Sequence, residues 1–373
     1  MKKIRLSYLR WTVLMVLLSF VLFASISSEF GEWYAIFIYP TVSKILSAIS
    51  SLFSFSLDEW VIVLLIVSLL VRPFYLRMKK KKGWFSLLTG EVELLLWIYV
   101  WFYWAWGMNY DRFSFYRRAD VKPAVYDEVR FHEFLASYTN GLNEAFSECC
   151  REGWMNSPDL FRAMVNLDGQ DHALMSMVHE DIKSRYRKVP SFYGLCLPQS
   201  YQFPKRSSFN AIYSNVGVLG FMGPFFSESH VNLELSVLEY PFTYAHELSH
   251  LLGVSSEAEA NLWAYVVCIQ SSRSLVRLSG YMGILSYVRF NAKQLLRPSE
   301  FEQWESSLPP EVMAAFYHIH AYWTSRYNST LGDIQSAMYT FYLKRNKISS
   351  GQKNYAQVIG MLLSLPNFQI SLK

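Results

Sequence analysis

The chain has 373 residues, of which 52% are hydrophobic and only 17% carry charge. That balance is too apolar for an ordinary soluble enzyme throughout its length. The net charge of +5 comes largely from basic residues beside the apolar segments, so it indicates no nucleic-acid partner. The cysteines are too few for a disulfide framework, and the absence of a C-x-x-C pair argues against a thiolate zinc site. They are Cys149, Cys150, Cys196 and Cys268.

Three apolar segments lie in the N-terminal part of the chain, with cores at Trp11–Ile26, Trp60–Val71 and Leu94–Trp106. Each core is shorter than the ~20 residues that cross a bilayer, so each needs its flanks. The third follows Glu91 and Glu93, so its start lies near an interface or faces other helices. No A-x-A-like cleavage site follows the first segment, and two more segments come after it. We therefore expect three retained transmembrane helices rather than a signal peptide.

Positive charge predicts the orientation of these helices. The N-terminus is basic, and a second basic cluster spans residues 72–82. Both belong on the cytoplasmic side, so three crossings place the rest of the chain outside the cytoplasm. Residues 1–109 are thus predicted to be a transmembrane region in contact with the lipid bilayer. Glu29–Leu57 is amphipathic, and it lies in the membrane interface or packs on the later domain; the sequence leaves both open.

Residues 110–373 are predicted to form one mainly helical domain of the α+β kind, since no long linker or repeat interrupts them. Aromatic and β-branched residues with Gly and Pro punctuation predict extended segments at Tyr193–Leu197 and Ser207–Leu219. Gly220–Phe226 is predicted to be a loop. Apolar residues recur at helical spacing in seven further segments. These are Glu128–Cys149, Asp159–Arg185, Pro241–Leu252, Ser256–Arg277, Tyr281–Leu296, Glu311–Arg326 and Leu331–Arg345.

The strongest chemical pattern is His246-Glu247-Leu248-Ser249-His250. On a helix, residues four apart share a face, so both imidazoles can reach one metal ion. Glu247 then stands where a carboxylate can take a proton from water that the metal activates. Because the flanking residues are mostly apolar, the helix is expected to be buried, where two His and a Glu are costly unless paired or metal-bound. We expect zinc, with one coordination position left open.

Two glutamates downstream are candidates for the third ligand. An unbroken helix would carry Glu257 roughly 10 Å past His250, so the helix must end near Gly253 and the chain must turn back. Ser256 and Glu259 form the S-x-x-E pattern of a capping box. That pattern gives Glu259 a structural role, so we favour Glu257 as the ligand and keep Glu259 as the alternative.

Further polar residues are predicted to surround this site. Asn261, four residues after Glu257, is placed to hydrogen-bond a ligand and fix its orientation. His230 near Glu228 is more typical of a solvated histidine than of a ligand. Tyr342 and Tyr355 are candidate donors to a developing oxyanion, although packing roles are the stronger expectation. A strand in Val216–Phe226 or Asn232–Leu238 is predicted either to line a substrate cleft or to be a core strand.

Several of these features together resemble a bacterial family of membrane-anchored proteins filed as a domain of unknown function. The resemblance rests on Trp106–Tyr110, Gly220–Asn232, the His246–His250 motif with Gly253 and Glu257–Asn261, and Tyr342–Asn346. It implies a zincin-like metallohydrolase fold, with His246, Glu247, His250 and one of the two glutamates at the site. The spacing from Glu257 to Asn261 is also distantly similar to the third-ligand helix of gluzincin peptidases, although the gap after His250 is much shorter here.

The resulting expectation is a membrane-anchored zinc metallopeptidase in the bacterial cytoplasmic membrane, acting on a peptide or protein. Its catalytic domain, residues 110–373, would lie on the extracytoplasmic side, with Glu247 as the general base. The alternative is a non-catalytic membrane protein that uses the zinc site structurally or to bind a peptide partner. An intramembrane protease is disfavoured, because the motif lies far beyond the last apolar segment and its flanks are too short to span a bilayer.

Overall fold

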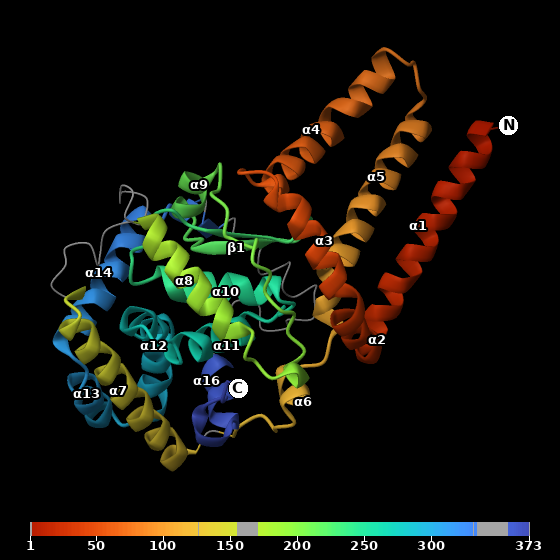
Figure 1. Ribbon diagram of the computed structural model, residues 1–373. Coiled ribbons are helices and arrows are strands. Elements are labelled where there is room, and N and C mark those ends of the chain that lie inside the picture. Colours follow the sequence, from red (N-terminus) through yellow and green to blue (C-terminus); the bar gives the residue numbers. More distant parts are fainter. Residues whose placement is uncertain (1, 126, 155–170, 331, 334–356, 373) are drawn as a thin grey trace. The chain divides into compact units, whose positions relative to one another are not determined.

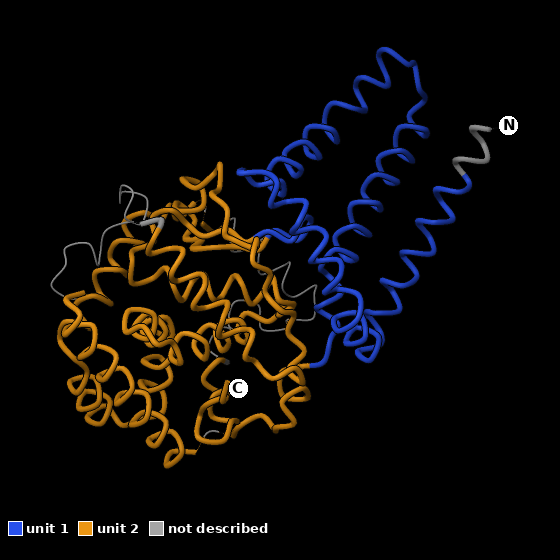
Figure 2. The backbone as a smooth tube through the Cα atoms, viewed as in Figure 1, with its two compact units in different colours: residues 1–113, 223–228 blue, residues 114–222, 229–373 orange. Residues whose placement is uncertain are grey.

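The computed structural model describes residues 2–125, 127–154, 171–330, 332–333 and 357–372, and these are mainly helical (Figure 1). The chain divides into two compact units (Figure 2). Unit 1 comprises residues 1–113 and 223–228, and unit 2 comprises residues 114–222 and 229–373. The boundary expected at 109/110 thus falls slightly later, and a short segment from the middle of the chain groups with the N-terminal unit.

Unit 1 is built around three long apolar helices, α1 (Lys2–Ile26), α4 (Leu57–Met78) and α5 (Trp84–Ala105). Each is long enough and apolar enough to cross a membrane. At 1.5 Å per residue, the 22 residues of α4 and of α5 extend about 33 Å, which matches the hydrocarbon core of a bilayer. The three apolar segments are therefore helices, each extended by its flanks as the length argument required, and they indicate membrane association.

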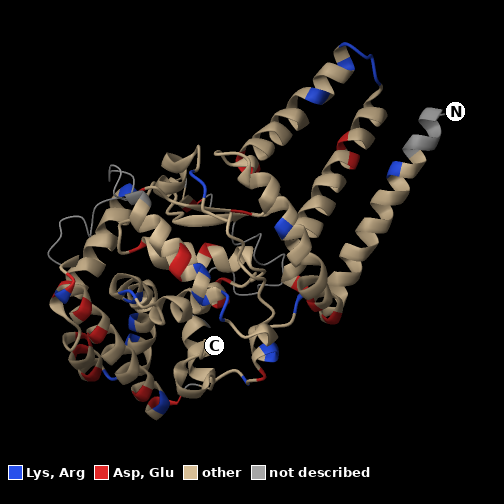
Figure 3. Ribbon diagram, viewed as in Figure 1, with Lys and Arg blue, Asp and Glu red and all other residues tan. Residues whose placement is uncertain are grey.

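Two ion pairs link these helices. Arg72 of α4 lies 3.1 Å from Glu91 of α5, and Arg10 of α1 lies 3.1 Å from Glu93 of α5. Both glutamates lie inside α5, where they face neighbouring helices, which was one of the two alternatives for this segment. Pairing offsets the cost of placing charge in an apolar layer. The connection from α4 to α5 carries the basic cluster (Figure 3).

Residues 223–228, the hairpin tip, belong to unit 1. Two buried carboxylates, Asp58 and Glu228, join the tip to the start of α4. The Glu228 carboxylate accepts hydrogen bonds from the Ser56 hydroxyl at 2.9 Å and from the amides of Leu57 and Asp58 at 3.0 and 3.2 Å. In return, the Asp58 carboxylate accepts from the amides of Phe225 and Phe226. A carboxylate at the start of α4 satisfies amides that lack a partner within the helix. Each buried charge is thereby hydrogen-bonded.

Unit 2 is mainly helical, with one two-stranded sheet among its described residues, and strand β1 ends on the first residue of the tip. The two strands are β1 (Gly220–Gly223) and β2 (Glu228–Val231). A single apolar core runs through α7, α10, α11, α12 and α16. The helices, in chain order, are α6 (Phe115–Ala119), α7 (Glu128–Arg151), α8 (Asp171–Tyr186), α9 (Asn210–Asn215), α10 (Tyr240–Leu251), α11 (Glu257–Ile269), α12 (Ser274–Leu295), α13 (Pro298–Ser306), α14 (Pro310–Arg326) and α16 (Gln357–Ser364).

Several local predictions for this unit were wrong. Ser256–Arg277 is not one helix, because α11 ends at Ile269 and α12 begins at Ser274. Ser207–Leu219 contains the short helix α9 rather than a strand, and Gly220–Phe226 holds β1 rather than being wholly loop. The β-branched and aromatic residues of 207–219 favoured a strand locally, and tertiary packing overrode that preference.

Other predictions fall where the structure gives no description. The first part of Asp159–Arg185 and nearly all of Leu331–Arg345 lie outside the described residues, as do Tyr342 and Tyr355. The described part of the first segment is helical in α8.

If the Asp58 carboxylate anchors the hairpin tip, its removal loosens the tip. Replacing Asp58 with Asn removes one acceptor from a buried pair of amides, at a cost of about 1–3 kcal/mol. We expect faster backbone hydrogen exchange in residues 223–228, measured by mass spectrometry on the full chain in detergent. Asp127→Asn, at the exposed N-cap of α7, is the matched control and leaves exchange in the tip unchanged. Unaltered exchange in Asp58→Asn would rule out this anchoring role.

Candidate metal centre

The turn between α10 and α11 positions the site. Helix α10 ends at Leu251, and Gly253 adopts a φ of +97°, which a glycine reaches without strain. The amide of Gly253 bonds the His250 carbonyl, and the amide of Val254 bonds the Ser249 carbonyl. The Ser256 side chain then accepts from the amide of Glu259 and caps α11. The predicted stop and restart are both present, and the two helices pack against each other.

Three side-chain atoms converge across this turn. The Nε2 atoms of His246 and His250 are 3.1 Å apart, and Glu257 Oε2 lies 3.2 and 3.4 Å from them. Tetrahedral zinc with ligand bonds of about 2.0–2.1 Å requires ligand atoms about 3.3 Å apart. The triangle therefore has the dimensions of one face of a zinc coordination sphere.

The second nitrogen of each imidazole is already engaged. His246 Nδ1 bonds the side-chain oxygen of Asn261 at 2.9 Å, and His250 Nδ1 bonds the Val254 carbonyl at 2.7 Å. Both partners are acceptors, so both Nδ1 atoms carry the proton and donate. In the neutral imidazole each Nε2 then presents a lone pair to the triangle. This is the tautomer that a metal ligand needs.

The electrostatics of the triangle favour a positive charge. Burial lowers the pKa of His250, but the charge of Glu257 and its hydrogen bond outweigh burial and raise that pKa to about 9. Burial raises the pKa of Glu257, yet the two histidines hold it well below the usual carboxyl value. The Glu257 carboxylate is therefore ionised, and its negative charge stabilises a positive charge beside the imidazoles. A divalent cation bound there provides such a charge.

Glu247 lies beside the triangle and is 5% exposed. Burial, only partly offset by the two histidines, raises its pKa to about 7. A carboxyl with this pKa exchanges a proton readily near neutral pH, which suits a general base. Strand β1 approaches it closely, because a Cβ built on Gly220 would lie 2.7 Å from Glu247 Oε1. A side chain at this position would displace that of Glu247, so Gly220 is a site residue. It lies in Val216–Phe226, one of the two segments in which a cleft-lining strand was predicted, but the sequence did not single it out.

The alternative ligand, Glu259, has other partners. Its carboxylate forms a buried ion pair with Arg118 of α6 and accepts a hydrogen bond from Trp263 Nε1 at 2.9 Å. Arg118 also donates to the carbonyl of Tyr193. Glu259 is absent from the group of converging ligand atoms among the described residues. Glu257 thus lies with the two histidines, whereas Glu259 pairs with Arg118.

A second residue that the sequence did not reveal is Tyr287 of α12. Its hydroxyl accepts a hydrogen bond from the side-chain amide nitrogen of Asn261 at 3.4 Å. The amide oxygen of Asn261 faces His246, and its amide nitrogen faces Tyr287. The bond to Tyr287 therefore keeps the oxygen directed at His246. Asn261 thus orients a candidate ligand, in the role predicted for it.

Other candidates lie elsewhere. His230 is buried in β2, stacked at 4.2 Å on the ring of Phe221, and it is not part of the converging group. It is therefore not the solvated residue expected. The acidic neighbour Glu228 belongs to the hairpin tip of unit 1.

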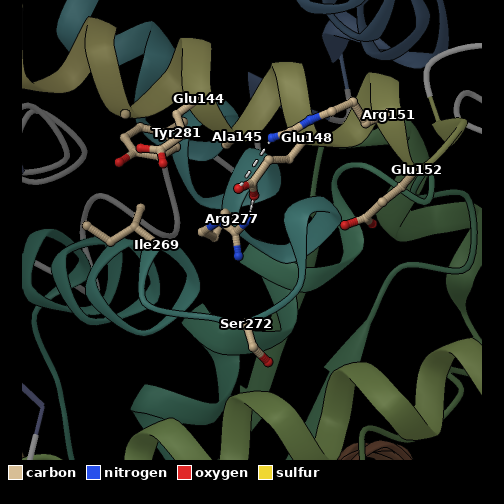
Figure 4. A pocket seen from close by; sticks show the side chains of 10 residues that line it. Glu144, Ala145, Glu148, Arg151, Glu152, Ile269, Ser272, Arg277 and Tyr281 are labelled. Carbon is tan, nitrogen blue, oxygen red and sulfur yellow. Dashed lines mark ion pairs between the residues drawn. The ribbon is translucent and has the colours of Figure 1, made fainter.

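Two further features of unit 2 do not extend the site. Glu128, His132 and Glu300 also converge, but Arg297 already holds the Glu300 carboxylate, and the group is largely exposed. A cavity of about 600 Å³ between α7 and α12 is lined by Glu144 and Tyr281 (Figure 4). Its polar groups pair across it, as Glu148 and Arg277 do, and it shares no residue with the metal centre.

A family model described as "Protein of unknown function (DUF3810)" matches residues 34–363. Because this match covers most of the chain, the chain belongs to that family, as its resemblance to a domain of unknown function indicated. No curated protein and no solved structure matches the chain.

The roles of the two glutamates are separable by metal content. Glu257→Ala removes one vertex of the triangle, so we expect bound zinc to fall from near one per chain to near zero. Glu259→Ala keeps the triangle and leaves Arg118 uncompensated, so zinc remains while stability falls by about 3–5 kcal/mol. The measurement is elemental mass spectrometry on the purified full chain, with thermal unfolding alongside. Equal zinc content in the two variants would show that the ligand set is wrong.

Asn261 is testable as the residue that orients His246. Asn261→Ala frees the imidazole to rotate, and we expect zinc affinity to fall by about 10–100-fold. A chelator competition titration measures this change. Asn291→Ala is the matched control, because Asn291 is a buried asparagine on α12 whose side-chain amide donates to the Tyr287 carbonyl. An affinity loss of the same size in both variants would contradict the assignment.

Proposed function

We propose that this protein is a membrane-anchored zinc metallopeptidase. The observation that carries the proposal is the triangle of His246 Nε2, His250 Nε2 and Glu257 Oε2. Two imidazoles and one carboxylate form a ligand set typical of catalytic zinc, and three protein ligands leave one position open. Bound zinc supplies a Lewis acid that activates water and polarises a carbonyl group.

The protein's own groups supply the proton chemistry. Glu247 follows the first ligand and is buried beside the site, where its carboxylate takes a proton from the attacking water and later passes it to the leaving amine. Its burial excludes bulk water from this transfer. Asn261 and the Val254 carbonyl hold the ligand imidazoles in place.

The position of β1 supports a peptide as the substrate. Among the described residues β1 pairs with β2 alone, so its other edge has no strand partner there. Gly220 brings this strand against Glu247. An extended peptide that adds to the edge of β1 gains backbone hydrogen bonds beside the general base. The basic connection between α4 and α5 supports an extracytoplasmic location for the catalytic unit.

The second candidate is a non-catalytic protein in which the same metal centre is structural. Such a centre is closed by a fourth protein ligand. The converging group contains three donors among the described residues, which favours the catalytic reading.

The role of Glu247 gives the direct test. Glu247→Gln keeps the shape of the side chain and removes its basicity, so we expect peptide hydrolysis to fall by at least about 10²-fold while zinc content stays unchanged. Cleavage of a proteome-derived peptide library by the full chain in detergent, read by mass spectrometry, measures the activity. Glu239→Gln is the matched control, since Glu239 is a half-buried carboxylate bonded to Ser236 and Trp323. Wild-type cleavage by Glu247→Gln would refute the assignment, and zinc-loaded wild type without any cleavage would favour the structural centre.

A further inference from the structure

The segment between the first two candidate spans is helical and belongs to unit 1. It comprises α2 (Ser28–Trp33), the π-helical turn η1 (Tyr34–Ile38) and α3 (Tyr39–Ser51). Because α1 and α4 are successive spans, the end of one and the start of the other lie on the same side of the membrane. The segment is therefore on the side opposite the basic connection from α4 to α5.

The buried face of α3 carries three serines beside Tyr39 and Leu46. Ser43, Ser47 and Ser50 are each 3–4% exposed. The Ser47 hydroxyl donates to the carbonyl of Ser43 at 2.6 Å, so the helix satisfies this group itself. Small residues four apart allow close helix packing where no hydrophobic effect drives association. Helix α3 packs against α5, and α2 packs against α1 (Figure 1).

The outward face of the same segment is apolar. Ile45 and Ile49 of α3 are 54% and 43% exposed, and Phe37 of η1 is 65% exposed. Trp33, Ile36, Leu52 and Phe53 extend this surface. Helix α3 thus buries three serines while it exposes two isoleucines, which is unusual for a helix on a water-soluble protein. Lys44 is the charged residue on the outward side of α3, and its long side chain can carry the charge to an interface.

A buried ion pair holds the segment in place. The Glu32 carboxylate of α2 accepts hydrogen bonds from the Arg112 guanidinium at 2.8 Å and from the amide of Phe113 at 3.0 Å. Both partners are nearly fully buried. The apolar face is thus presented by a fixed element of the unit.

We propose that residues 28–53 are embedded in lipid, with Phe37, Ile45 and Ile49 against the acyl chains of the leaflet opposite the basic connection. The 13 residues of α3 extend about 20 Å, too short to cross a core of about 30 Å, so the segment enters one leaflet. The helices α1, α4 and α5 of the same unit also expose large apolar side chains. The sequence left open whether this segment lies in the membrane interface or packs on the later domain. We assign it to the membrane, and this assignment does not depend on the metal centre.

The test is the depth of single nitroxide labels on the full chain in lipid vesicles. Cys150 and Cys196 are first replaced with Ser, while the buried Cys149 and Cys268 remain. One cysteine at a time is then introduced by Ile45→Cys or Ile49→Cys. Collision rates with oxygen, which concentrates in lipid, and with a water-soluble nickel chelate are compared.

Three reference positions calibrate the reading. Leu64→Cys, on the exposed face of α4, reports lipid; Val129→Cys, exposed on α7, reports water; and Ser47→Cys reports the protein interior. We expect Ile45→Cys and Ile49→Cys to match Leu64→Cys, with nickel collisions several-fold below those at Val129→Cys. Nickel access equal to that at Val129→Cys would overturn the proposal. Low access to both reagents, as at Ser47→Cys, would also overturn it and would show that protein covers this face.

Discussion

The reversal of the chain between His250 and Glu257 is the constraint on which the candidate site depends. Continued helix would carry the carboxylate far from the imidazoles, and the left-handed conformation at Gly253 prevents that. The restart at Ser256 then places Glu257 in the first turn of α11, facing back toward α10. The distances of 3.1–3.4 Å among the three ligand atoms follow from this geometry. A short turn and two packed helices suffice to build the triangle.

Compensation of buried charge explains why the surrounding residues are arranged as they are. Helix α11 begins with two buried glutamates, and each has its own cationic partner. Glu257 faces the imidazoles, whereas Glu259 faces Arg118 from an element far away in the sequence. Removing one partner from a buried pair costs several kcal/mol, so this division also fixes α11 against α6. The structural pair thereby keeps the candidate ligand in register.

The same rule applies to unit 1, whose three long helices are apolar enough to cross a membrane. Arg72 and Glu91 pair, Glu32 holds Arg112, and Asp58 and Glu228 each bond backbone amides. Helix α3 satisfies the Ser47 hydroxyl within its own backbone. These polar groups bond within the unit, and many apolar side chains of its helices are exposed. This distribution is what a low-dielectric environment requires of a folded chain.

Local pattern in the sequence determined the three apolar helices, the motif helix, the stop at Gly253 and the cap at Ser256, because each depends on near neighbours along the chain. The choice of Glu257 over Glu259 could be argued but not settled, since it depends on Arg118, which only folding brings near. The approach of Gly220 to Glu247, the bond from Asn261 to Tyr287 and the inward serines of α3 likewise required the tertiary structure. Contacts between distant segments leave no periodic signal in either segment, so the fold alone decided them.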